Sequence, residues 1–234
     1  MLDVSSPPVS RRERERLARR RAMLEAALAV FGEKGFEGAT LDEVAERAEF
    51  GKGTLYNYFP GGKDELYLAL FDEYVVTGME TVIAEAFEDP DEVTTVEGAR
   101  RSFRRMIAGL IDHFETNRSV LLLFLREGHR LGTDPAVVIR FAERFERVFH
   151  GVAVQVERAT AAGTLRDLPA RPVAHLLMGN VRGYLMANLM AGADCPAGGS
   201  LAPLPDPDEA ADFITTVLFD GLLADPDRPA AGRA

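Results

Sequence analysis

Apolar positions recur every three or four residues along most of the chain, which is the pattern of amphipathic helices. The first such run carries Leu17, Leu24, Leu28 and Phe31. It is expected to close at two glycines, Gly32 and Gly35. No segment alternates with a period of two for long enough to predict a strand.

Two shorter helices are predicted next. Thr40 and Glu43 have the spacing of a capping box, in which a hydroxyl and a carboxylate satisfy exposed amides at a helix start. After a turn at residues 49–51, a third helix is predicted over 52–59, with Leu55 and Phe59 facing inward. Proline and glycines at 60–62 end it. Three helices of this kind indicate a helix-turn-helix.

The remainder of the chain has longer helical patterns, divided by Asn, Gly and Pro. Helices are expected over residues 63–89, 95–116, 118–131, 135–162, 172–190 and 208–223. The predicted fold class is therefore all-α, with about nine helices. A three-helix helix-turn-helix domain comes first, and a larger helical domain follows it. The predicted boundaries are 1–12 for an N-terminal tail, 13–62 and 63–225 for the two domains, and 226–234 for a C-terminal tail.

Charge is distributed unevenly. The chain has 27 Lys+Arg and 37 Asp+Glu among 234 residues, a formal net charge of -10. Residues 1–63 hold 11 basic and 10 acidic residues, a net charge of +1, and the remaining 16 basic and 27 acidic residues give -11. The total excludes a protein that coats nucleic acid without specificity, but it leaves room for a local DNA-binding surface in the N-terminal part.

Other function classes are disfavoured by simple features. The longest apolar run, residues 120–125, is far shorter than the roughly 20 residues of a membrane span. Residues 1–10 lack the apolar region of a secretory signal. A cytoplasmic location and no membrane partner are therefore expected. Cys195 is the only cysteine, which excludes an intramolecular disulfide and a zinc site with several thiolates. It is either an incidental thiol or a redox sensor. No cofactor and no metal are expected.

Three stretches carry a family pattern: residues 36–41, Val44-Ala45 and the run GKGTLYNYFP at 51–60. They resemble the DNA-binding segment of TetR-family transcriptional regulators. The resemblance covers about residues 15–75. It implies that the third helix enters the major groove and that the protein is a regulator rather than an enzyme. The family pattern usually has Gly where Glu49 stands and Ser where Gly51 stands, which implies a weaker cap on the third helix. The linker before Lys63 is one residue longer than usual.

The resemblance also implies which residues contact the operator. On the third helix these are Lys52, Gly53, Thr54, Tyr56, Asn57 and Tyr58. Thr40 and Lys63 are expected to contact phosphates on either side. The seven arginines between residues 11 and 21 are interleaved with Glu13 and Glu15, so they fit either a DNA-contacting arm or a solvated helix face.

The resemblance implies that the larger domain binds an effector and forms a homodimer. The apolar faces of its last two helices either pair with a second chain or complete the core of the monomer. The candidate dimer contacts are Val173, Leu177, Tyr184, Leu185, Phe213, Val217, Leu218 and Leu222. The candidate ligand contacts are polar or aromatic residues within apolar stretches: His113, Phe114, Asn117, Arg126, His129, Phe145, Phe149, Asn180 and Tyr184.

The hypothesis is a dimeric repressor that binds pseudo-palindromic double-stranded operator DNA and is released by a small-molecule effector whose identity the sequence does not give. The alternatives are a ligand-independent DNA-binding regulator and a helical enzyme with a site in the C-terminal core. The chain has no Glu-x-x-His, His-Glu-x-x-His or Gly-x-Ser-x-Gly motif, so no catalytic residue is predicted.

Overall fold

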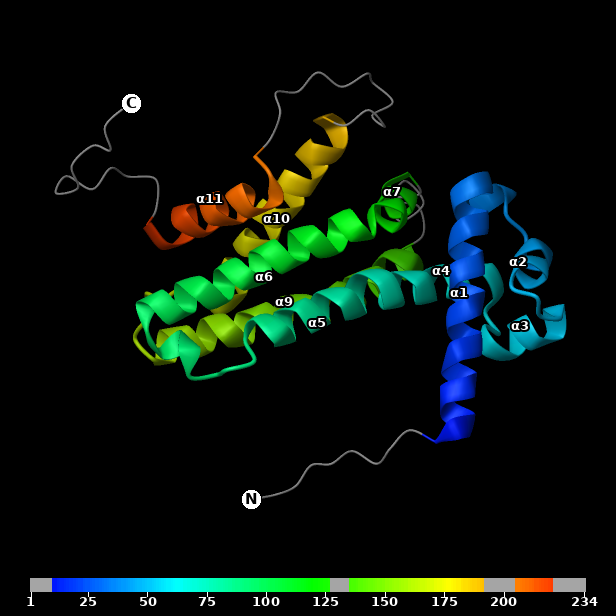
Figure 1. Cartoon of the computed structure of the whole chain (residues 1–234), viewed down its shortest axis with the longest axis horizontal. Helices are drawn as coiled ribbons and strands as arrows, with labels where there is room; N and C mark the ends of the chain where they lie inside the picture. Colours follow the sequence, from blue (N-terminus) through cyan, green and yellow to red (C-terminus); the bar gives the residue numbers. More distant parts are fainter. Residues whose placement is uncertain (1–9, 127–134, 192–204, 221–234) are drawn as a thin grey trace. The chain divides into compact units, whose positions relative to one another are not determined.

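The computed structural model describes residues 10–126, 135–191 and 205–220, and within these ranges it contains helices and no strand (Figure 1). The helices are α1 (Arg11–Gly38), α2 (Leu41–Arg47), α3 (Lys52–Tyr58), α4 (Gly62–Phe71), the π-helix η1 (Asp72–Val76), α5 (Thr77–Ala86), the short 3-10 helix η2 (Glu92–Thr94), α6 (Val96–Thr116), α7 (Arg118–Arg126), α9 (Pro135–Ala161), α10 (Ala170–Ala191) and α11 (Pro207–Asp220). The predicted all-α class is confirmed. The predicted helix over 63–89 is a run of three segments, α4, η1 and α5.

The chain folds into two compact units. The first comprises residues up to Thr77 together with 117–142, and the second comprises 78–116 together with the residues from 143 onward. The first unit therefore contains α7 and the start of α9 as well as the helix-turn-helix. The functional boundary expected between residues 62 and 63 stays a prediction.

The core of the first unit is aromatic. Tyr67 of α4 lies between two pairs of rings, with centroid distances of 5.2 Å to Phe36 of α1 and 4.7 Å to Phe124 of α7. Phe71 lies 4.4 Å from Phe141 of α9, again between ring centroids. Aromatic contacts of this kind add to ordinary apolar burial, so four helices share one core. Helix α1 breaks at Gly35, whose φ is 70°, close to the end predicted by its glycines.

The second unit contains close helix crossings. Gly78 of α5 faces His113 of α6, and a β-carbon on Gly78 would lie 2.0 Å from the His113 ring. Helix α11 packs along α6, where Arg104 binds Asp212 and, at 3.3 Å, Asp208. These contacts make α6 the central helix of the unit.

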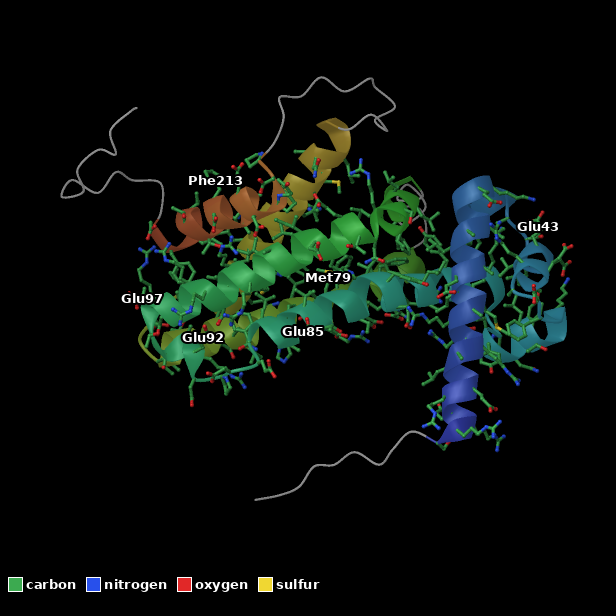
Figure 2. The ribbon with its side chains drawn as sticks, in the orientation of Figure 1. Glu43, Met79, Glu85, Glu92, Glu97 and Phe213 are labelled. Carbon is green, nitrogen blue, oxygen red and sulfur yellow. The ribbon has the colours of Figure 1, made fainter. Side chains whose placement is uncertain are left out.

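The Glu92 carboxylate of η2 binds side chains from the first turns of α6 (Figure 2). Glu92 accepts hydrogen bonds from Arg105, from Arg101 at 3.1 Å and from Ser102 at 3.0 Å. The Arg105 hydrogen bonds are the main reason that the pKa of Glu92 falls to about 2. The charged form of Glu92 therefore stabilises this unit.

Within the described ranges, every helix is too short or too polar to cross a membrane.

Candidate nucleic-acid interface

Helix α2 begins with the predicted capping box. The Thr40 hydroxyl accepts a hydrogen bond from the Glu43 amide at 3.3 Å, and the Thr40 amide donates to the Glu43 carboxylate at 3.0 Å. A hydrogen bond from Lys34 and those from Thr40 lower the pKa of Glu43. Thr40 is exposed, so its hydroxyl serves the helix start at the surface where phosphate contact is expected.

The turn between α2 and α3 has the geometry expected from Glu49 and Gly51, the two positions at which the chain differs from the usual family pattern. Glu49 has a φ of 59°, in the left-handed region that favours glycine. Gly51 is the N-cap of α3 and supplies no side-chain hydrogen bond. The turn therefore contains a strained residue and an uncapped helix start.

Two apolar anchors fix which face of α3 is exposed. Leu55 and Phe59 are 1% and 2% exposed. On the other side Tyr56 is 42% exposed, large for an aromatic residue on a monomer surface, and Asn57 is also exposed. A β-carbon at Gly53 would meet no atom within 4 Å, so the protein's own packing does not require glycine there. The face is open, and it carries groups suited to bases and phosphates.

The two predicted lysine contacts differ. Lys52 is exposed and forms an ion pair with Asp42 of α2 at 2.8 Å, which raises the pKa of the lysine. Lys63 donates to the Glu37 and Ala39 carbonyls at 3.3 and 3.1 Å and lies 4.6 Å from the Phe36 ring centroid. Lys63 thus holds the end of α1, and its predicted phosphate contact is not needed to explain its position.

The sequence comparisons agree with this geometry. A model of the bacterial regulatory proteins of the tetR family matches residues 23–70. The transcriptional repressor SCO4008 of Streptomyces coelicolor is 30% identical over 157 residues, which are 67% of this chain and 72% of that protein.

The chain belongs to the tetR family. It is a sequence-specific DNA-binding transcriptional regulator. The repressor AcnR of Corynebacterium efficiens is also similar, at 26% identity over 74% of this chain and 83% of AcnR. The crystal structure of FadR from Bacillus subtilis in complex with stearoyl-CoA shares the fold, with a TM-score of 0.67 at 16% identity over 87% of this chain and 99% of FadR.

The candidate ligand residues of this tetR-family chain are not gathered at one point. His113 and Phe114 are neighbours on α6, with Phe114 buried and His113 half-buried against Gly78. Phe145 and Phe149 lie one turn apart on α9, with ring centroids 6.4 Å apart. The Phe149 ring lies 4.1 Å from the ring of His175, a residue that was not among the predicted ligand contacts.

The other candidate ligand residues have different surroundings. Asn180 donates to the Leu176 carbonyl of its own helix at 2.8 Å and is exposed. Tyr184 donates to the Pro205 carbonyl at 2.9 Å, and burial raises the pKa of its hydroxyl. Asn117 and Arg126 belong to the first unit. His129 lies outside the described residues, as do Leu222 and Cys195 of the other predictions.

The candidate dimer residues differ in their exposure on the single chain. Leu177 and Leu185 are 3% and 6% exposed, so they fill the core of their own chain. Val173, Tyr184, Val217 and Leu218 are half-buried. Phe213 is 64% exposed on α11 (Figure 2), as expected for an interface. Leu176, one position before a predicted residue, is 59% exposed.

Proposed function

We propose that this regulator is a homodimeric repressor that binds a pseudo-palindromic operator with two copies of α3. The observation that carries the proposal is the division of α3 into a buried side with Leu55 and Phe59 and an open side with Tyr56 and Asn57. A helix held in this way presents its polar face to a major groove. The repressors AcnR and SCO4008 support repression as the direction of control.

The dimer surface that we propose lies on α10 and α11. Leu176, Gly179, Asn180 and Gly183 are all exposed and fall on one stripe of α10, at intervals of three and four residues. A β-carbon at either glycine would meet no atom within 4 Å of its own chain, so a partner helix would find room there. Phe213 adds a large exposed ring on α11. The two glycines leave room for close approach, and the exposed Leu176 and Phe213 side chains supply apolar surface, so these helices suit a two-fold helical interface.

The effector that we propose is a small molecule with an apolar part, bound in the second unit. Support comes from the partly exposed rings of Phe145, Phe149 and His175 and from the FadR structure, which is a complex with stearoyl-CoA. An effector releases the operator only if it prefers the conformation that does not fit DNA.

The DNA-binding part is tested by selecting an operator duplex from random sequences and measuring binding by fluorescence anisotropy. Thr54→Ala and Tyr56→Ala should each weaken operator binding by about tenfold or more, because each removes a group from the open face. Thr116→Ala, an exposed threonine at the end of α6, is the matched control and should bind as the wild type does. Equal binding by all four proteins would refute the assignment of α3.

The effector part is tested with the same operator complex. A panel of acyl-CoA thioesters, fatty acids and aromatic acids is titrated into it, and release of DNA is measured. Phe149→Ala should shift the release midpoint to higher ligand concentration and leave operator affinity unchanged. Release by the panel with no effect of Phe149→Ala would place the effector elsewhere, and binding that no effector perturbs would favour the ligand-independent regulator.

A further inference from the structure

A groove lies beside α3 on the first unit. It has a volume of about 640 Å³ and is lined by Ser10, Arg12, Glu13, Glu15, Arg16, Arg19 and Tyr58. Tyr58 is the last residue of α3, and every other lining residue belongs to the N-cap or the first turns of α1. The groove therefore adjoins the helix that we propose reads the operator.

Three arginines share the groove side of α1. Arg12, Arg16 and Arg19 are spaced by four and three residues, which places them within a stripe of about 60° on a helix with about 100° per residue. The seven steps from Arg12 to Arg19 span about 10 Å, enough to face two or three phosphates of one DNA strand. Arg21 falls about 180° away from Arg12, on the far side of the same helix.

The acidic residues of the groove are already neutralised in part. Glu15 binds Arg11, which is outside the lining, at 2.8 Å, and Glu13 binds Arg16 at 3.4 Å. Arg12 and Arg19 form no ion pair within the described residues. Among the described residues, two guanidinium groups thus remain available to an anion, and Arg16 makes one long contact, to Glu13.

We propose that this groove binds the sugar-phosphate backbone of DNA next to the half-site that α3 reads. The inference rests on the proposed operator binding and deepens it, because it adds a backbone-contacting surface to the predicted set of contacts. An elongated row of guanidinium groups beside an exposed recognition face suits a duplex backbone better than a compact free anion. Contacts of this type position a protein on DNA and increase its affinity for all sequences alike.

The experiment measures operator affinity against salt concentration for the full chain. In the triple variant Arg12→Gln, Arg16→Gln and Arg19→Gln, the negative slope of log K against log salt should become shallower by about 5 for the dimer, since each lost phosphate contact removes about 0.9. Operator affinity should fall at least about tenfold at 0.1 M salt, and the ratio of operator to scrambled-duplex affinity should stay unchanged.

The control is Arg21→Gln, which removes one positive charge from the far side of α1 and is compared with the single variants Arg12→Gln and Arg19→Gln. Its slope should stay close to that of the wild type. The single variants Arg12→Gln and Arg19→Gln break no ion pair within the described residues, so they replace the triple variant if it is unstable. Each should make the slope shallower by about 1.8 for the dimer. Circular dichroism confirms that each protein is folded.

The outcomes separate this proposal from the broader one. A wild-type protein that selects no operator refutes the proposed function itself. A wild-type protein that binds its operator while the triple variant keeps the same slope and affinity refutes only the backbone groove. A triple variant that loses the preference for operator over scrambled DNA would mean that the arginines read bases, and that result also overturns the proposal. Equal loss of binding in Arg12→Gln, Arg19→Gln and Arg21→Gln would mean that only net charge matters, and that result also overturns the proposal.

Discussion

Asp42 forms an ion pair with Lys52, the lysine of α3 that is predicted to face DNA. Its carboxylate lies 2.8 Å from the Lys52 ammonium group, and both side chains are more than half exposed. A phosphate bound to Lys52 at a similar distance would therefore lie about 6 Å from the Asp42 carboxylate. Two like charges at that distance in water repel each other enough to weaken binding about threefold, and salt reduces the factor.

Asp42→Asn should consequently strengthen operator binding by about threefold to tenfold for the dimer at 0.1 M salt. The slope of log K against log salt should become steeper by up to about 1.8, because one more cation per protomer is available to neutralise a phosphate. Only a small loss of thermal stability is expected, since ion pairs this exposed contribute little. Fluorescence anisotropy over a salt series gives both the affinity and the slope.

Glu46→Gln is the matched control, because it removes one negative charge from the same helix at a residue that forms no ion pair within the described ranges. A general effect of net charge would make the two variants equal. In a Lys52→Gln background, Asp42→Asn should lose most of its effect. Weaker binding by Asp42→Asn would show instead that the carboxylate orients Lys52 for DNA, and it would refute the expected repulsion between Asp42 and the phosphate.

Three further predictions concern stability and assembly. Glu49→Gly should raise the free energy of unfolding by about 0.5 kcal/mol, because relief of a left-handed φ of 59° exceeds the added chain entropy; chemical denaturation measures it, and a loss of stability would contradict it. The pKa of Glu92 is about 2, below its unfolded value, so the stability it provides is complete above about pH 5 and is lost as the pH falls towards 2; Glu92→Gln should remove about 1–2 kcal/mol at pH 7 and flatten this dependence in a denaturation series. Leu176→Glu with Phe213→Glu should convert the dimer to monomer in sedimentation equilibrium, whereas Val96→Glu, at a residue 50% exposed on α6, should not, and equal behaviour would place the interface elsewhere.

The helices could be predicted from the sequence because their ends are marked chemically. Gly35, the capping residue Thr40 and the glycines after Phe59 each interrupt the apolar pattern where the structure has a break or a helix end. The π-helix over 72–76 was not predicted, because a local change of hydrogen bonding leaves the apolar spacing almost unchanged.

Side-chain direction was harder to predict than helix position. On α10, Leu176 and Leu177 are both apolar, yet a rotation of about 100° between them places one on the surface and the other in the core. The role of Lys63 depends on carbonyls more than 20 residues earlier. The family pattern predicts which residues form the DNA interface, but it does not specify such contacts across the fold.

The aromatic core changes how the chain divides between DNA binding and regulation. Phe124 and Phe141 are distant from the helix-turn-helix in sequence, yet both contact Tyr67, which also contacts Phe31 and Phe36 of α1. The functional boundary predicted after residue 62 differs from the packing, which joins residues 117–142 to the unit that carries α3. A displacement of α7 or of the start of α9 must therefore repack the aromatic core against α1, because a close-packed interior transmits strain rather than absorbing it. Such a displacement would reach the helix-turn-helix through this core.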